Sequence, residues 1–208
     1  MRSHFRLLCV FVALAVSVGC SEEKPQLSPL SQSSTILAFG DSLTYGTGAS
    51  KRESYPTILK QLTGIKVINE GIPGEVSGKG KARLGQILKK HQPDIVILCH
   101  GGNDLLQKID TNKTINNLKN MITMIKESGS EVVILSVPRP GLMLKPAPFY
   151  EEISTEMDIP IIAGLLSEIL SDRELKSDTA HPNGKGYRQM AKAIADLLLE
   201  RKAINQLN

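Results

Sequence analysis

The chain has 208 residues, 41% of them hydrophobic and 22% charged, which suits one globular domain with a substantial core. Its 25 lysines and arginines are nearly balanced by 21 aspartates and glutamates. So small a positive excess argues against a nucleic-acid partner and against a polybasic membrane-binding patch.

Residues 1–19 have the pattern of a secretory signal peptide. Arg2 and Arg6 precede an apolar run from Leu7 to Val18, and the stretch contains no acidic residue. The run is shorter than the roughly 20 residues of a membrane-spanning helix, and small residues rather than charges follow it. We therefore expect residues 1–19 to be removed on export.

The end of this segment, Val16-Ser17-Val18-Gly19-Cys20, resembles a bacterial lipobox, although Ser17 stands where leucine is usual. The resemblance implies a lipid on Cys20 and a membrane-anchored lipoprotein of the cell envelope. Ser21 in the next position indicates the outer membrane, facing the periplasm. An ordinary secretory signal that happens to contain Cys20 is the alternative, but no A-x-A cleavage site lies nearby.

The stretch from Cys20 to residue 34 is rich in Ser, Pro and Glu, which predicts a flexible tether after the anchor. A single folded domain is expected over residues 35–204. Five apolar runs in it predict strands, and their continuous Ile, Val and Leu content is typical of strands covered on both faces. They are Thr35 to Phe39, Lys66 to Asn69, Asp94 to Cys99, Glu131 to Val137 and Ile159 to Ala163.

Segments with apolar residues at three- and four-residue spacing alternate with these runs and predict helices. They are Tyr55 to Thr63, Gly80 to Gln92, Thr114 to Ser128, Ala163 to Leu170 and Tyr187 to Lys202. Alternating strands and helices predict an α/β fold: a doubly wound parallel sheet in a three-layer α/β/α domain. Ligands of such domains bind beyond the carboxyl ends of the strands.

Ser42 lies in Gly40-Asp41-Ser42-Leu43, directly after the first predicted strand. A serine at this point lies at the carboxyl edge of the sheet. Taken alone, the motif also fits a strand-to-helix turn in which Ser42 is only an N-cap.

A carboxylate and a histidine stand three residues apart in Asp178-Thr179-Ala180-His181, just before the last predicted helix. A serine hydroxyl is a poor nucleophile unless a base such as imidazole takes its proton, and a carboxylate orients that imidazole. Asp178 and His181 can supply both groups. A capping aspartate with an exposed histidine is the simpler alternative.

Together, Gly40-Asp41-Ser42-Leu43 and Asp178-x-x-His181 resemble the first and last signature blocks of the SGNH, or GDSL, hydrolases. The middle blocks are similar too: Gly102-Asn103-Asp104 resembles the Gly-x-Asn-Asp block, and Gly74 stands in the place of the family glycine. The resemblance covers about Thr35 to Leu199 and implies the flavodoxin-like SGNH-hydrolase fold. Within the family, the chain is most similar to the bacterial branch of arylesterases, thioesterase I and lysophospholipases.

The resemblance implies acyl transfer through an acyl-enzyme intermediate. Ser42 is then the nucleophile, His181 the base and Asp178 its orienting carboxylate. The expected oxyanion donors are the backbone N–H groups of Ser42 and Gly74 and the side-chain amide of Asn103.

Several other polar residues have simpler interpretations. We expect Asp41 and Asp104 to fix loops by accepting backbone N–H groups. His100 is expected to be a non-catalytic loop histidine, although it could line the pocket, and Cys99 to be a buried apolar residue. The apolar segment from Pro138 to Tyr150 either binds an acyl chain over the active-site edge or packs as a stiff connection.

The sequence thus predicts a serine esterase for short-to-medium acyl or aryl esters, lysophospholipids and, less plausibly outside the cytosol, thioesters. A carbohydrate acetyl esterase and a non-catalytic lipoprotein that binds a ligand are the alternatives. We expect a monomer with a small-molecule ester or lipid substrate and no metal or organic cofactor.

Overall fold

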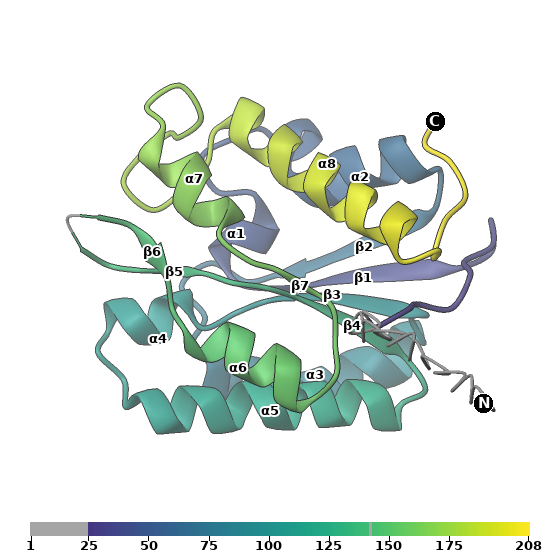
Figure 1. Ribbon diagram of the computed structural model, residues 1–208, viewed down its shortest axis with the longest axis horizontal. Helices are drawn as coiled ribbons and strands as arrows, with labels where there is room; N and C mark the ends of the chain where they lie inside the picture. Colours follow the sequence, from purple (N-terminus) through teal and green to yellow (C-terminus); the bar gives the residue numbers. More distant parts are fainter. Residues whose placement is uncertain (1–24, 142) are drawn as a thin grey trace, which may run out of the picture.

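A parallel β-sheet forms the centre of the protein in this computed structural model, which describes residues 25–141 and 143–208 (Figure 1). The strand order is β2 (Lys66–Gly71), β1 (Thr35–Gly40), β3 (Ile95–Cys99), β4 (Glu131–Leu135) and β7 (Ile161–Ile162), with all neighbours parallel. Every residue of β1 and β3 is buried, because these interior strands are covered on both faces. The predicted signal peptide and Cys20 lie outside the described residues.

Helices cover both faces of the sheet and complete three layers (Figure 1). One face carries α1 (Ser42–Tyr45), α2 (Tyr55–Thr63), α7 (Leu165–Ser171) and α8 (Gly184–Glu200), with the short 3₁₀ helix η1 (Lys51–Glu53) between α1 and α2. The other carries α3 (Ser77–His91), α4 (Gly102–Leu106), α5 (Thr111–Glu127) and α6 (Phe149–Glu156). This arrangement confirms the predicted three-layer α/β/α fold with a parallel sheet.

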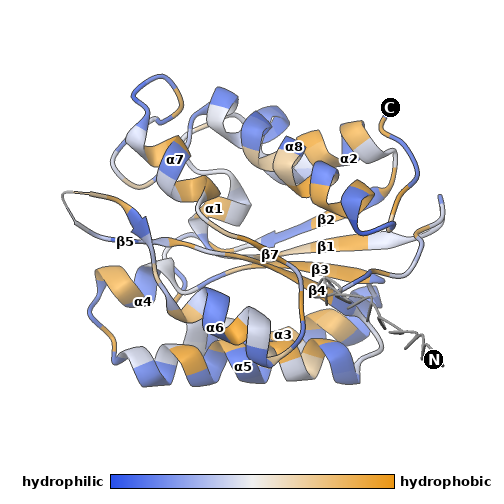
Figure 2. Ribbon diagram, in the orientation of Figure 1, coloured by the Kyte–Doolittle hydropathy of each residue, from blue (hydrophilic) through white to orange (hydrophobic). Residues whose placement is uncertain are grey.

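The hydrophobic pattern of the helices matches this layering. In α8, Tyr187, Met190, Ile194 and Leu198 recur at three- and four-residue spacing and are fully buried. Figure 2 shows hydrophobic residues along the central strands and hydrophilic residues on outer turns of the helices. Across residues 25–141 and 143–208, no helix is long and apolar enough to cross a bilayer.

Each predicted strand and helix is present, with ends that differ by a few residues. In two helices, a side-chain cap explains the earlier start. Helix α5 begins at Thr111 rather than Thr114, since the Asp110 side chain accepts the Lys113 N–H. Helix α8 begins at Gly184 rather than Tyr187, since the Asn183 side chain accepts the N–H groups of the first turn.

The region from Pro138 to Glu156 contains structure that the sequence did not predict. An antiparallel hairpin joins β5 (Pro138–Arg139) to β6 (Lys145–Pro146). Helix α6 follows, and its Phe149, Tyr150 and Ile153 are buried in the core. Prolines before α6 suggested a loop, yet Pro148 occupies its N-cap position, where a missing N–H costs no helical hydrogen bond.

The N-terminal boundary of the folded part differs from the predicted one. Leu27 is only 6% exposed, and its N–H donates to the Arg201 carbonyl at 3.1 Å, while the Leu30 N–H donates to the Ala203 carbonyl at 2.7 Å. The Ser28 N–H donates to the carboxylate at the start of β4. The described part of the predicted tether from Leu27 onward is therefore packed against the domain, because one buried leucine and backbone hydrogen bonds hold it.

Candidate active site

Ser42 lies at the carboxyl end of β1, as the first residue of α1. Asp41 caps this helix, since its carboxylate accepts the Leu43 backbone N–H at 3.0 Å. Gly40 lets β1 approach β3 closely, because a Cβ at this position would lie 2.0 Å from the Cys99 carbonyl oxygen. The motif therefore turns the chain sharply from strand to helix and leaves Ser42 at the rim of the sheet.

The loop between α7 and α8 brings Asp178 and His181 to Ser42. His181 Nε2 lies 3.0 Å from Ser42 Oγ, and His181 Nδ1 lies 2.8 Å from Asp178 Oδ2. The Asp178 carboxylate also accepts the backbone N–H groups of Ala180 and His181 at 2.7 and 2.9 Å. Burial alone would raise the pKa of Asp178, but these hydrogen bonds outweigh it and lower the pKa from 3.8. The imidazole therefore faces an ionised carboxylate at neutral pH.

A pocket of about 440 Å³ opens beside these three groups, a size within the usual range for small-molecule sites. Ser42, Gly74, Asn103 and His181 all contribute to its wall. The rest of the wall is mainly apolar and includes Leu43, Pro73, Leu106, Val137, Pro138, Pro140, Leu144 and Leu170. The site therefore combines a small polar corner with an apolar cavity.

The residues expected to donate to an oxyanion lie at the polar end of this pocket. Gly74 has φ +76°, a left-handed conformation that favours glycine, and a Cβ there would meet no atom within 4 Å. Asn103 is in α4, and its Nδ2 donates to Asp41 Oδ2 at 3.2 Å and to the Glu75 carbonyl at 3.1 Å. The backbone conformation at residue 74 thus favours glycine, and two acceptors hold the Asn103 amide.

The Pro138 to Tyr150 segment fits both of its proposed roles in part. Pro138, Pro140 and Leu144 of the hairpin line the pocket, whereas Phe149 and Tyr150 pack in the core. The hairpin at the start of the segment therefore forms part of the pocket wall, and the end of the segment packs in the core.

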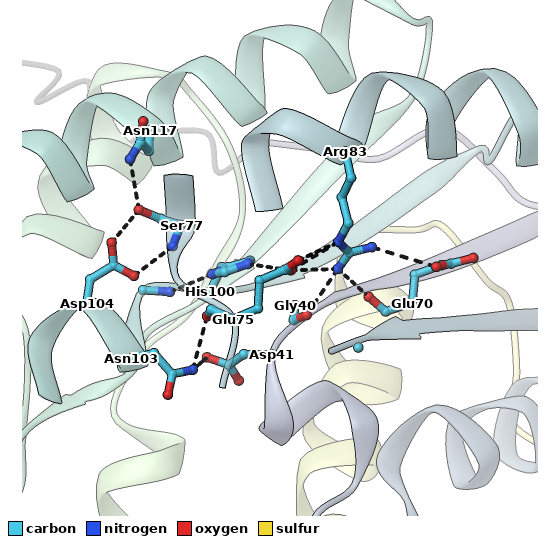
Figure 3. A network of polar contacts seen from close by, with 12 residues as sticks. Gly40, Asp41, Glu70, Glu75, Ser77, Arg83, His100, Asn103, Asp104 and Asn117 are labelled. Carbon is cyan, nitrogen blue, oxygen red and sulfur yellow. Dashed lines mark hydrogen bonds and ion pairs between the residues drawn. The ribbon is translucent and has the colours of Figure 1, made fainter. Parts of the chain in front are cut away.

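A buried polar network lies beside the loop that follows β2 (Figure 3). The Glu75 carboxylate accepts a hydrogen bond from Arg83 Nε at 2.8 Å and lies 3.2 Å from His100 Nε2. Arg83 also donates to the Glu70 carbonyl at 2.8 Å, and its guanidinium carbon lies 4.1 Å from the centre of the Phe39 ring. Sequence reasoning missed Glu75 and Arg83, because isolated charged residues near a helix resemble solvated surface groups.

The remaining candidates have structural partners. Asp104 accepts the Ser77 N–H at 2.7 Å, so it fixes a loop as expected, as does Asp41 at the start of α1. His100 is fully buried and does not line the pocket. Cys99 is a buried residue, as expected, and its burial raises the pKa of its thiol. Among the residues that the structure describes, no group of three or more His, Cys, Asp or Glu could hold a metal ion.

Sequence comparisons identify relatives that cover most of the chain. An arylesterase of Vibrio mimicus is 30% identical over 186 residues, which span 84% of this chain and 93% of that protein. The Escherichia coli K12 protein named thioesterase 1/protease 1/lysophospholipase L1 is 31% identical over 157 residues, or 72% of this chain and 76% of that protein.

Structural comparisons show the same fold. The psychrotrophic esterase EstA of Pseudoalteromonas sp. superposes with a TM-score of 0.70 at 24% identity, covering 79% of this chain and 98% of that one. A two-domain esterase active on acetylated mannans gives 0.69 at 21% identity, covering 82% of this chain and 49% of that one.

The family comparison covers the blocks that carry the site. The sequence profile of the GDSL-like lipase/acylhydrolase family matches residues 38–189, a range that begins just before Ser42 and ends beyond His181. The chain therefore belongs to the GDSL-like lipase/acylhydrolase family.

Proposed function

We propose that the protein is a serine esterase that acts through an acyl-enzyme intermediate. The observation that carries this proposal is the chain of contacts from Ser42 Oγ to His181 Nε2 at 3.0 Å and from His181 Nδ1 to Asp178 Oδ2 at 2.8 Å. A hydroxyl, an imidazole and a carboxylate in this order form the arrangement that activates a serine for attack on a carbonyl.

In the first step, Ser42 Oγ attacks the ester carbonyl carbon and His181 Nε2 takes the hydroxyl proton. The ionised Asp178 keeps the other imidazole hydrogen on Nδ1 and stabilises the resulting imidazolium. His181 then returns its proton to the leaving alcohol oxygen as the C–O bond breaks, which leaves the acyl group on Ser42. Water then attacks the acyl carbonyl carbon while His181 takes its proton, and His181 passes this proton to Ser42 Oγ as the bond between that oxygen and the acyl group breaks, which releases the carboxylic acid.

The negative charge that develops on the carbonyl oxygen needs donors that are already in place. We assign this role to the N–H groups of Ser42 and Gly74 and to Asn103 Nδ2. The hydrogen of Asn103 directed to Asp41 is the one available to the oxyanion, because Asp41 lines the pocket and Glu75 does not. Removal of one such donor typically lowers kcat by about 10²–10³.

The mainly apolar pocket supports an acyl or aryl group as the part of the substrate that it encloses. Leu106, Val137 and Leu144 offer hydrophobic contacts but no charged partner for a polar acyl chain. We propose short-to-medium acyl esters and aryl esters as the substrate class, in keeping with the arylesterase name of the Vibrio mimicus relative. Lysophospholipids and thioesters, which appear in the name of the Escherichia coli relative, are further members of this class to test.

The test is hydrolysis of p-nitrophenyl esters from acetyl to palmitoyl by the purified mature chain, with Ser42→Ala in parallel. We expect turnover that peaks at short-to-medium chains and disappears in Ser42→Ala. Asp178→Asn should retain substrate binding but lose about 10⁴-fold in kcat, because the imidazole takes the wrong tautomer.

Activity on acetyl esters alone would favour a carbohydrate acetyl esterase. Folded wild-type protein without activity at any chain length would refute the proposed acyl and aryl ester substrates and leave a narrow sugar-acetyl substrate or a non-catalytic role.

We also propose that Cys20 carries the lipid that anchors the enzyme in the outer membrane, facing the periplasm. The support is the lipobox-like sequence before this cysteine. Metabolic labelling with palmitate should mark the wild-type protein and leave Cys20→Ala unlabelled. Equal labelling of both would contradict the proposal.

A further inference from the structure

Glu75 connects the oxyanion loop to the buried polar network (Figure 3). The residue is 7% exposed and directly follows Gly74. Its carbonyl oxygen accepts the Asn103 amide at 3.1 Å, while its carboxylate reaches Arg83 and His100. Glu75 thus contacts an assigned oxyanion donor, Asn103, through its backbone. Its carboxylate contacts the partly buried Arg83 and the fully buried His100.

The two groups that hold the Glu75 carboxylate are themselves fixed. Arg83 binds it with Nε and Nη2, both at 2.8 Å, and also donates to the carbonyls of Gly40 and Glu70 at the ends of β1 and β2. His100 is fully buried and its Nδ1 accepts the Gly101 N–H at 3.1 Å, so its Nε2 carries the hydrogen donated to Glu75. We call Arg83 and His100 the clamp of the Glu75 carboxylate. Through its contacts, this clamp ties the loop that contains Glu75 to the ends of three neighbouring strands, β1, β2 and β3.

Stability alone is a weak reason for this arrangement. A buried ion pair costs much of its attraction in desolvation, and well-packed apolar side chains often serve a fold equally well. Catalysis, in contrast, needs donors held within fractions of an ångström, since a misplacement of about 1 Å can cost about 10²-fold in rate. The clamp holds the loop that contains Gly74 and Glu75 in a fixed position, as catalysis requires of a loop beside the oxyanion site.

We infer that Glu75 is a positioning residue for the oxyanion site. Its carboxylate, clamped by Arg83 and His100, fixes the peptide whose carbonyl orients the Asn103 amide. Glu75 touches no reacting atom and acts through Asn103. The inference rests on the proposed esterase mechanism and adds to it a residue outside the pocket wall.

The first test compares Glu75→Ala and Glu75→Gln with Glu70→Gln. The Glu70 carboxylate also pairs with Arg83, at 3.7 Å, and with His91, at 3.0 Å, but it has no hydrogen bond to Gly74 or Asn103, so it controls for the loss of a charge beside Arg83. We expect Glu75→Ala to lower kcat about 10–100-fold with KM within about threefold, because donors preset for the transition state are disturbed.

We expect smaller losses of kcat in the other two variants. Glu75→Gln should lose less, about 3–10-fold, because its amide oxygen still accepts from one partner. Glu70→Gln should remain within about threefold of wild type.

A double-mutant cycle with Asn103→Ala separates positioning from general damage. If Glu75 acts through Asn103, adding Glu75→Ala or Glu75→Gln to Asn103→Ala should cost less than about threefold more. Fully additive losses, or equal effects of Glu75→Gln and Glu70→Gln, would overturn the inference.

If Glu75→Ala does not fold, the double-mutant cycle is measured with the isosteric Glu75→Gln instead. Active wild type with inactive Ser42→Ala shows that the esterase mechanism holds. A failure of the Glu75 inference is thereby distinguished from a failure of that mechanism.

Discussion

Gly80→Ala tests how tightly the buried network is packed. Gly80 lies on the buried face of α3, and a Cβ at this position would lie 2.3 Å from Nε2 and 2.8 Å from Cδ2 of His100. Ordinary contact begins near 3.4 Å. The imidazole must therefore move by about 1 Å, yet it has no exposed surface and hydrogen bonds at both nitrogens.

The expected cost combines three terms. Overpacking of a filled core costs about 1–3 kcal/mol, and loss of the hydrogen bond to the Glu75 carboxylate costs about 1.5–3 kcal/mol. Alanine within a helix stabilises the folded state by about 1 kcal/mol relative to glycine, which offsets part of this cost. We expect Gly80→Ala to be less stable by about 1.5–5 kcal/mol, which lowers Tm by about 3–20 °C for a domain of this size.

Urea and thermal unfolding of Gly80→Ala and Gly85→Ala provide the assay. Gly85 is in the same helix, but a Cβ there would meet only the flexible end of Met124, at 3.4 Å. This control should be neutral or more stable by up to about 1 kcal/mol. If Gly80→Ala is as stable as Gly85→Ala, the description of His100 as immovable is wrong.

Three further changes probe other parts of the structure. Burial raises the folded-state pKa of Asp41 above its ordinary 3.8, so its carboxyl stabilises the fold only at low pH, and this contribution is lost as the pH rises through the folded value. Asp41→Asn should therefore raise the urea midpoint at pH 7 and lose this advantage below about pH 4; a constant difference across that range would contradict the shift. Tyr150→Phe removes the hydroxyl that donates to the His100 carbonyl at 2.7 Å, and calorimetry should show a loss of about 1–3 kcal/mol from the unpaired buried carbonyl. Leu27→Ala should cost about 2 kcal/mol in urea unfolding if this residue belongs to the core, and nothing if it belongs to a tether.

Local patterns carried most of what the sequence could predict. The fold followed from apolar runs that alternate with amphipathic segments, and α8 shows why: its buried residues repeat at helical spacing. The blocks around Ser42, Asn103 and His181 were also found, because each is a short motif at the end of a predicted element. The topology then places their side chains at one edge of the sheet.

Contacts between distant residues were out of reach. Glu75 lies just before α3 and Arg83 within it, whereas His100 follows β3, so only the packing of α3 beside the end of β3 brings the three together. Leu27 was missed for a similar reason, since a single leucine among polar residues has no periodicity. Helix α6 was hidden by prolines that precede it rather than interrupt it.

The N-terminal segment joins the domain on the side opposite the pocket. Leu27 and Ser28 contact Arg201 and the first residue of β4, at the amino ends of the strands (Figure 1). The pocket lies at the carboxyl ends, where Ser42 follows β1. From Cys20 to Leu27 an extended backbone reaches at most about 25 Å. A molecule held by a lipid on Cys20, as proposed, would therefore turn its pocket away from its own leaflet and draw substrate from the aqueous space beyond.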